Sequence, residues 1–311
     1  MMTPYEFAAL RKNFPVKDEQ GLNDFQRLPD DTGIVVEQVG INRFRLPLNF
    51  NHTDGTVMNH DTEATMLVRL DSGKTGINMS RLVLILQEEG QKGVVNMEMI
   101  DRVLHRYQSE MRDEPQEPML KDLSLKLEFS YCMPQQSLKS NHNSWQFYKS
   151  VIEGKRTDNA TRLFLGVEYE YSSTCPCSLS LAHQYEDDFH AGRTTEGNGI
   201  ATAHAQRSIA KVKVEVDPEE SYWLEDLVSL LRETIPTETQ AIVKRVDEQA
   251  FAILNGSHPI FVEHAARKLH LALNHDERIL DWSASIEHQE SLHSHNAMAK
   301  IHKGTPDGLR P

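Results

Sequence analysis

Apolar and polar residues alternate with a period of two in three long segments of the chain. Every second residue is apolar in 123–131, in 163–171 and in 210–216, and polar or charged residues fill most of the positions between them. Successive side chains of a strand point to opposite faces, so this pattern predicts antiparallel strands with one buried and one solvated face. A weaker alternation over 64–70 predicts a further strand.

Elsewhere the apolar residues recur every three to four positions, which is typical of helices packed on a core. This spacing predicts helices over 97–107 and 223–231. The second should begin at Asp217-Pro218-Glu219-Glu220, where a cap, a first-turn proline and carboxylates favour a helix start. Ser257 and Pro259 should open another helix that continues to Leu269, and Leu280 to Ile286 should form a strand.

The order of these elements repeats along the chain. A strand pair, helices and a strand occupy about 42–131, and the same order returns over about 160–290. Alternating strands favour an α+β architecture over a parallel α/β sheet, whose strands are apolar on both faces. We therefore predict two tandem units of antiparallel strands with helices packed on one face.

The predicted boundaries follow from shifts in composition. The stretch 136–160 is rich in Gln, Ser, Asn and Lys and is expected to be a linker, and both ends are expected to be loosely held. The predicted division is a leader (1–30), a first unit (31–135), the linker (136–160), a second unit carrying most of the site (161–300) and a tail (301–311).

Composition and charge exclude several classes of protein. The 311 residues include 33 Lys and Arg against 46 Asp and Glu, a net charge of −13. A protein that coats nucleic acid needs a broad basic surface, so nucleic acid is not an expected partner. No apolar run approaches the roughly 20 residues that span a bilayer. Three cysteines are too few for a disulfide framework, and we expect a cytoplasmic protein with free thiols.

Two cysteines and a histidine stand at the ends of two predicted strands. Cys175 and Cys177 follow the strand over 163–171, and His204 precedes the strand over 210–216. If these strands pair as an antiparallel hairpin, the cysteines lie near His204. Thiolate and imidazole suit Zn²⁺ and similar ions, and a third carboxylate ligand with one open position would make the site catalytic. The spacing alone leaves open a pair of structural cysteines beside an unrelated histidine.

Four other motifs carry weaker signals. Lys244 to Glu248 places two cations and two carboxylates at a helix start, which fits a phosphate and metal anchor or a solvated helix end. Glu263 can accept two hydrogen bonds from a guanidine-like edge or face the surface. Glu290, His293 and His295 could move protons or bind metal. Arg81 follows a glycine turn and a capping serine, which explain it adequately.

Together these motifs resemble GTP cyclohydrolase of type IB, and they run in the family's order across about residues 40–300. The matching pieces are Gly76-Ile77-Asn78-Met79-Ser80-Arg81, Ser173-Thr174-Cys175-Pro176-Cys177-Ser178, His204-Ala205-Gln206-Arg207-Ser208, Val243-Lys244-Arg245 with Asp247-Glu248, Phe261-Val262-Glu263, and Glu290-Ser291-Leu292-His293-Ser294-His295-Asn296-Ala297.

The resemblance implies a tunnelling fold with two tandem units per chain, assembled into a homotetramer whose active sites lie at subunit boundaries. It implies conversion of GTP and water to 7,8-dihydroneopterin triphosphate and formate, the entry step of folate biosynthesis. It also implies one divalent metal ion per site, Zn²⁺, Mn²⁺ or Fe²⁺, held by Cys175, His204 and Glu248. Water activated by this metal would attack C8 of GTP.

The resemblance implies further roles. Cys177 would lie against the purine, Glu263 would hold the guanine edge, and Glu290 and His293 would serve proton transfer. The triphosphate needs cations, for which Arg207, Lys244, Arg245 and Arg81 are the candidates.

Two departures from the family pattern and three alternatives stay open. Asn78 stands where histidine is expected, and the connection 179–203 is longer than usual. A connection of that length is usually functional or disordered. The alternatives are a related cyclohydrolase with a cyclic phosphate product, a tunnelling-fold nitrile reductase with a cysteine nucleophile, and a non-catalytic purine or pterin binder.

Overall fold

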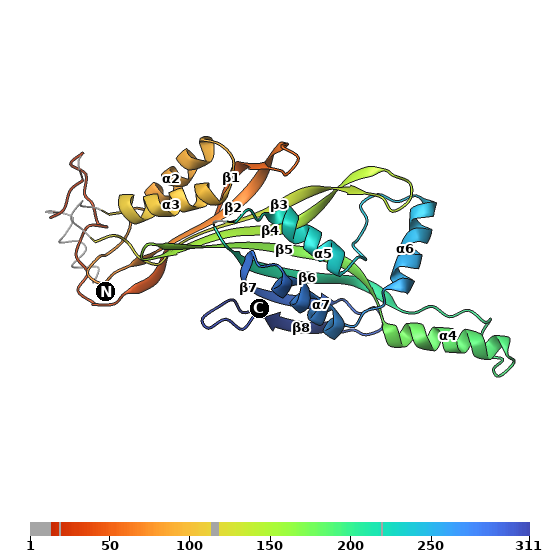
Figure 1. Ribbon diagram of the computed structural model, residues 1–311. Helices are drawn as coiled ribbons and strands as arrows, with labels where there is room; N and C mark the ends of the chain where they lie inside the picture. Colours follow the sequence, from red (N-terminus) through yellow and green to blue (C-terminus); the bar gives the residue numbers. More distant parts are fainter. Residues whose placement is uncertain (1–13, 19, 113–117, 219) are drawn as a thin grey trace. The chain divides into compact units, whose positions relative to one another are not determined.

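The computed structural model describes residues 14–18, 20–112, 118–218 and 220–311 (Figure 1). Residues 1–13 of the expected leader and Glu219 of the expected helix start lie outside the described residues. The elements, in chain order, are β1 (Val36–Asn51), β2 (Val57–Leu70), α2 (Met79–Gln91), α3 (Met97–Glu110), β3 (Leu123–Gln136), β4 (Asn143–Thr157), β5 (Ala160–Thr174), α4 (Pro176–His190), β6 (Ala205–Val216), α5 (Leu224–Thr234), α6 (Arg245–Ser257), α7 (Val262–His275), β7 (Ile279–His288) and β8 (Ala297–His302).

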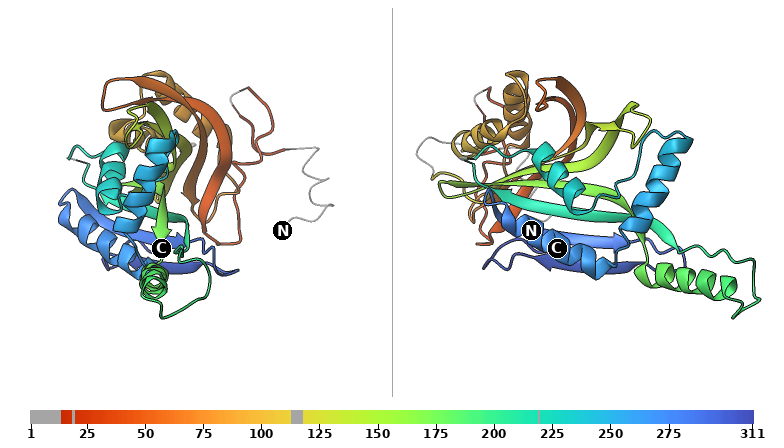
Figure 2. Two further views of the ribbon diagram at one scale, coloured as in Figure 1. Left: turned by 90° about the vertical axis from the view of Figure 1, so that its right-hand side faces the viewer. Right: turned by 45° about the vertical axis from the view of Figure 1, so that its right-hand side comes forward.

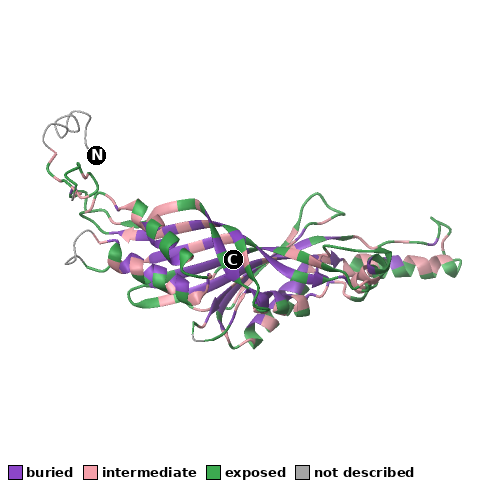
Figure 3. Ribbon diagram, turned by 90° about the horizontal axis from the view of Figure 1, so that it is seen from above, coloured by how far each residue is buried: buried purple, intermediate pink, exposed green. Residues whose placement is uncertain are grey.

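The described strands form one eight-stranded sheet in which each strand is hydrogen-bonded to the next along the chain. The pairs β1–β2, β5–β6, β6–β7 and β7–β8 are antiparallel. The four segments predicted as strands from their alternation lie inside β2, β3, β5 and β6. Figure 3 shows buried positions recurring along the strands. The predicted α+β class with antiparallel strands is confirmed.

The structure differs from the expected elements in several places. Residues 143–157, inside the stretch expected to be a linker, form β4, where apolar residues such as Trp145 and Phe147 alternate weakly among many polar ones. The long connection after Cys175 contains α4. Residues 297–302, which follow the last predicted motif, form β8, whose six residues are too few for a clear alternation.

Two helices begin later than their sequence signals indicated. Helix α5 begins at Leu224 and not at the Asp217-Pro218 signal, because the carboxylate of Asp226 accepts a hydrogen bond from the backbone N–H of Trp223 at 2.8 Å. This bond satisfies an N–H group that would otherwise be unpaired at the helix start. Ser257 and Pro259 do not open α7 either, since Ser257 ends α6 and α7 begins at Val262.

The chain divides into two compact units. One comprises the chain up to Asn51, Gly55–Leu127 and Glu153–Thr161, and the other comprises His52–Asp54, Glu128–Ile152 and Arg162–Pro311. Each unit therefore draws on segments that are distant in sequence. Among the described helices, none is both long and apolar enough to cross a membrane.

In the first unit, α2 and α3 lie side by side and α2 contacts β1 (Figure 1). Their apolar faces bury Leu82, Leu86, Ile100 and Leu104. Tyr107 is fully buried, and its hydroxyl donates to the carbonyl of Leu82 at 3.1 Å. Buried apolar side chains of this size each stabilise the fold by roughly 1.5–3 kcal/mol.

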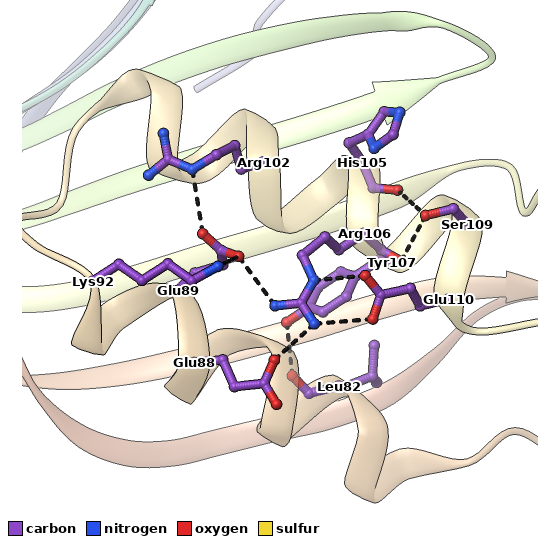
Figure 4. Close-up of polar contacts among 10 residues, drawn as sticks. All are labelled: Leu82, Glu88, Glu89, Lys92, Arg102, His105, Arg106, Tyr107, Ser109 and Glu110. Carbon is purple, nitrogen blue, oxygen red and sulfur yellow. Dashed lines mark hydrogen bonds and ion pairs between the residues drawn. The ribbon is translucent and has the colours of Figure 1, made fainter.

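A charged network joins these two helices on their polar side (Figure 4). The carboxylate of Glu89 is almost fully buried and accepts hydrogen bonds from Lys92 at 2.6 Å, Arg102 at 3.2 Å and Arg106 at 3.0 Å. Burial by itself raises the pKa of Glu89, but these three bonds lower it below its ordinary value. A buried carboxylate is tolerated here because it is paired.

In the second unit, α7 packs against β7 and β8, and α5 packs against α7 (Figure 2). The core between helices and strands includes Trp282, Leu227, Leu231, Leu269 and Val214, all fully buried. Helix α4 projects beyond the ends of β5 and β6 in both Figure 1 and Figure 2. The connection between these two strands thus begins with a helix, which starts at the residue that follows Cys175.

Candidate active site

The β5–β6 hairpin brings Cys175 and His204 together. Thr174 and Ala205 are the last paired residues of the ladder, and the backbone N–H of Cys175 donates to the carbonyl of His204 at 3.1 Å. The prediction that the two strands pair and that this cysteine meets this histidine is confirmed at the level of the backbone.

A pocket of about 260 Å³ opens at this end of the hairpin. It draws its walls from the hairpin end, the start of α7, the end of β7 and the loop that follows β7. Its lining residues are Cys175, His204, Gln206, Ile260, Phe261, Val262, Glu263, His288, Glu290, His293, His295 and Ala297. Six of the residues singled out from sequence thus share one cavity: Cys175, His204, Glu263, Glu290, His293 and His295.

The two cysteines of the Cys-Pro-Cys motif have different surroundings. Cys175 is half-buried and is the residue before the first residue of α4, Pro176. Cys177 lies inside the first turn of α4, is exposed, and is not among the residues lining the pocket. Pro176 fits this place because the first residue of a helix needs no backbone N–H donor.

His204 faces two acceptors at the pocket wall. Its Nδ1 lies 3.0 Å from Oε1 of Gln206 and 3.6 Å from Oε2 of Glu290. The side chains of His204 and Glu290 are 17% and 12% exposed, so both groups are largely withdrawn from water. This arrangement holds the imidazole by one nitrogen.

Helix α7 brings Glu263 to the pocket. The backbone N–H of Ile260 donates to the carbonyl of Thr174 at 2.9 Å, which ties the residues before α7 to the end of β5. Glu263 stands in the first turn of α7, where the helix dipole favours a negative charge. Its exposed carboxylate is available to a ligand.

The loop after β7 carries the remaining acid and the histidines. The N–H of Gln289 donates to the carbonyl of Arg207 at 3.1 Å, which fixes the start of the loop on β6. The rings of His293 and His295 stack with centroids 5.0 Å apart and planes 13° apart. Among the described residues no hydrogen bond joins Glu290 to His293; Oε2 of Glu290 lies instead 3.6 Å from Nδ1 of His204.

Sequence reasoning missed His288 and Gln206 as pocket residues. His288 is 2% exposed and its Nε2 lies 2.8 Å from the hydroxyl of Tyr171. Burial lowers the pKa of His288 to about 4, against the opposing charge of Glu263, so the ring is neutral near pH 7. The alternation of β6 and β7 could have indicated them. Gln206 lies four positions before the buried Ala210, and His288 lies two positions after the buried Ile286, so each shares the inward face of its strand.

Other predicted residues lie outside this pocket. Arg207 is exposed and pairs with Glu170 at 3.6 Å; it alternates with Gln206 and so points to the opposite face. Lys244 and Glu248 are exposed at the start of α6. Arg81 belongs to the first unit, where it donates to the carbonyls of Glu110 at 2.8 Å and Arg112 at 3.0 Å.

The neighbour of Glu248 explains why α6 starts where it does. Asp247 is fully buried and accepts hydrogen bonds from the backbone N–H groups of Lys139 at 2.7 Å, Ser140 at 2.8 Å and Lys244 at 2.8 Å, and from the Ser140 hydroxyl. Burial raises the pKa of Asp247, but these bonds lower it well below the ordinary value. Asp247 therefore anchors the helix, which leaves Glu248 pointing into solvent.

The pocket contains residue types that can bind a divalent metal. Cys175 offers sulfur, His204 offers nitrogen, and Glu290 offers oxygen from the same cavity. Borderline ions such as Zn²⁺ bind these three kinds of donor, and a site with few protein ligands keeps a position open for water or substrate.

Comparison with known proteins identifies the family. The family model described as type I GTP cyclohydrolase folE2 matches residues 22–299. The chain is 42% identical over 281 residues to the GTP cyclohydrolase FolE2 of Dinoroseobacter shibae, covering 89% of this chain and 72% of that protein. It is 38% identical over 299 residues to the GTP cyclohydrolase FolE2 of Cereibacter sphaeroides strain ATCC 17025, covering 94% and 79%.

Among solved structures the fold is similar to that of uricase. The uricase from Arthrobacter globiformis superposes with a TM-score of 0.53 at 9% identity, covering 86% of this chain and 94% of that chain. A hyper-thermostable mutant of AgUricase gives 0.51 at 9% identity, covering 86% and 92%. At this identity the likeness concerns the fold alone, and it confirms the tunnelling fold. From the family match and these relatives, the chain belongs to the type I GTP cyclohydrolase FolE2 family.

Proposed function

We propose that this protein is a metal-dependent GTP cyclohydrolase that converts GTP and water to 7,8-dihydroneopterin triphosphate and formate, the first step of folate biosynthesis. Membership of the family and relatives named GTP cyclohydrolase FolE2 support the activity. The observation that carries the proposal is the single cavity in which Cys175 and His204 meet Glu263, Glu290 and His293. This cavity combines proposed metal ligands, a carboxylate that would bind the guanine base, and side chains that would transfer protons.

Cys175 and His204 would hold one divalent ion, Zn²⁺, Mn²⁺ or Fe²⁺. Such an ion supplies Lewis-acid activation of water, whose pKa falls toward about 7 when it is bound. Glu248 is the proposed third ligand, and it does not line the pocket of its own chain. We assign it to the active site of a neighbouring subunit, in a homotetramer whose sites lie at subunit boundaries.

Glu263 would recognise the guanine edge. Guanine presents two neighbouring N–H donors, and an ionised carboxylate offers two oxygen acceptors in a matching plane. The exposed carboxylate of Glu263 is held at the start of α7, which the Ile260–Thr174 hydrogen bond fixes beside Cys175. Glu263 lines the same cavity as Cys175 and His204, which supports base recognition beside the proposed metal ligands.

His293 would donate a proton to the purine nitrogen as C8 becomes tetrahedral, and Glu290 would assist that transfer. Ring opening, loss of formate and reclosure each need a proton moved over a short distance. Cys177 is proposed to lie against the purine, and Arg207, Lys244 and Arg81 to meet the triphosphate. The reaction is proposed to take place in the cytoplasm.

A direct assay tests the function. Purified protein supplied with GTP should release formate and a fluorescent pterin after oxidation, and metal analysis should find one divalent ion per chain. Cys175→Ala and His204→Ala should lose both the ion and turnover while the circular dichroism spectrum is unchanged. The matched control is His183→Ala, an exposed histidine of α4 that does not line the pocket. Full turnover by metal-free Cys175→Ala protein would remove the proposal.

The same assay separates the alternatives. The mass of the product distinguishes a triphosphate from a cyclic phosphate. A nitrile reductase would consume a reduced nicotinamide, and a non-catalytic purine or pterin binder would bind GTP and release no formate.

A further inference from the structure

We propose that Gln206 is a positioning residue, which fixes the tautomer and orientation of His204 so that its Nε2 faces the metal-binding side of the pocket. The claim concerns a residue that acts through another one. The part of this inference that concerns metal binding rests on the proposed function. The part that concerns the tautomer of His204 does not, because the tautomer is measured on the metal-free chain.

The argument begins with what surrounds Nδ1 of His204. Oε1 of Gln206 lies 3.0 Å away, and Oε2 of Glu290 lies 3.6 Å away. An amide oxygen and an ionised carboxylate oxygen are both acceptors only. A neutral imidazole facing two acceptors is stabilised when Nδ1 carries the proton, which leaves the lone pair on Nε2.

The amide of Gln206 is itself held in place. Its Nε2 donates to the hydroxyl of Ser173 at 2.8 Å, and that hydroxyl lies 2.7 Å from the hydroxyl of Ser208. Ser173 and Ser208 are fully buried, and Gln206 is 8% exposed. Because the amide nitrogen is occupied by Ser173, the amide oxygen is directed toward His204. The pairing of β5 with β6 supports this series of hydrogen bonds, since Ser173 and Gln206 are paired residues of the two strands.

The free nitrogen of His204 has no other partner in the described part of the chain. His204 lines the pocket beside Cys175, and no hydrogen bond of its Nε2 is formed with the described residues. A histidine that ligates a metal usually donates its other ring N–H to such an outer partner, which sets the tautomer and the ring angle. Gln206 supplies this partner as a neutral group.

This assignment also gives Gln206 and Glu290 different roles beside His204. Gln206 makes the hydrogen bond at 3.0 Å, and Glu290 stands further away at 3.6 Å. Since the amide holds Nδ1, the carboxylate of Glu290 is not needed to orient the ring. Its charge is then available for the proton transfer proposed for it.

The first measurement is the tautomer of His204 in the metal-free full chain, labelled with ¹⁵N in its histidines and studied by NMR at about pH 8, where histidine is neutral. The ring signals are assigned by their loss in His204→Gln. The wild type should carry the proton on Nδ1. Gln206→Leu should move it partly or fully to Nε2, and Gln206→Glu, which keeps an acceptor, should retain the wild-type tautomer.

The second measurement is the affinity for Mn²⁺ alone, from competition with a chelator. Gln206→Leu should bind Mn²⁺ about 10- to 100-fold more weakly than wild type, the usual cost of losing an outer-shell partner. The matched control is Gln135→Leu, which removes another buried glutamine with hydrogen bonds to Glu238 and Ala241, away from this pocket. It should leave the affinity within about twofold of wild type.

An unchanged tautomer and unchanged Mn²⁺ affinity in Gln206→Leu would overturn the inference. If that variant does not fold, Ser173→Ala takes its place, because it releases the amide of Gln206 with a small change in volume; a tautomer identical to wild type in that variant overturns the inference equally. A wild type that releases no formate, but shows the Nδ1 proton and loses it in Gln206→Leu, contradicts the proposed function and supports the role of Gln206.

Discussion

The hydroxyl of Tyr171 lies 2.8 Å from Nε2 of His288; both side chains are buried, and His288 lines the pocket. The ring planes meet at 78° with centroids 5.8 Å apart. Burial lowers the pKa of His288 to about 4, with Glu263 acting in the opposite direction. The hydrogen bond therefore joins two neutral groups near pH 7, and acid must place a charge on a buried ring.

The pH dependence of stability should reveal this histidine. In the unfolded chain His288 titrates near its ordinary pKa of about 6.5, so as the pH falls below that value the unfolded state gains a proton that the folded state does not take up until about pH 4. Stability is fully present above about pH 6.5 and is lost between there and about pH 4, in total by about 3 kcal/mol.

Urea unfolding of wild type and His288→Gln at about pH 7 and about pH 5 measures this effect. The variant retains an acceptor for Tyr171 but has no titrating ring. Wild type should lose about 2 kcal/mol more than the variant between the two pH values. Parallel losses in the two proteins would show that His288 is not the group responsible.

Removal of the His293 imidazole should separate binding from chemistry. We expect His293→Ala to bind GTP with nearly the wild-type affinity and to release formate about 10²- to 10⁴-fold more slowly, which is the usual contribution of a general acid or base. Equilibrium binding and formate release are measured on the same preparation. His183→Ala again serves as the exposed control, and an unchanged rate in His293→Ala would end its proton-transfer role.

Asp247 and Glu248 are neighbours, but replacing the first should lower stability, whereas replacing the second should lower metal affinity and turnover. Asp247→Asn replaces a buried carboxylate that accepts from Lys139, Ser140 and Lys244, so the urea midpoint should fall. Glu248→Gln changes an exposed carboxylate, so the midpoint should stay unchanged while metal affinity and turnover fall. Urea unfolding and metal titration of both variants test the pair. Equal destabilisation by both would contradict the anchoring role of Asp247.

The charged network between α2 and α3 should depend on Glu89 far more than on Glu88. The Glu89 side chain is 1% exposed and faces three cations, whereas Glu88 is 55% exposed and pairs with Arg106 at 2.7 Å. Glu89→Gln should lower the free energy of unfolding by about 2 kcal/mol, because a neutral amide cannot replace a buried carboxylate that accepts charge-assisted hydrogen bonds from three partly exposed cations. Glu88→Gln should change it by less than about 1 kcal/mol. Denaturant unfolding of the two variants decides the matter.

The local sequence was sufficient for most of the strands and for the centre of the site. Alternation is a property of consecutive residues, so 123–131, 163–171 and 210–216 predicted β3, β5 and β6 without knowledge of their neighbours. The proximity of Cys175 and His204 followed as well, because the end of one strand lies beside the start of the next in an antiparallel pair, whatever the length of the connection. By contrast, α5 began at Leu224 because Asp226 reached back to cap it, and the Asp217-Pro218 signal did not start a helix.

What the sequence by itself determined is therefore the class of fold and the pairing of the hairpin, and it supplied the candidate metal ligands. Tertiary structure decided which of two adjacent carboxylates is buried at α6, because the donors to Asp247 come from Lys139 and Ser140, more than 100 positions away. It also decided that Gln206 and His288 line the pocket as neutral hydrogen-bonded groups. A side chain's solvation and its partners depend on segments that the local pattern does not contain, and those two quantities set its charge and its role.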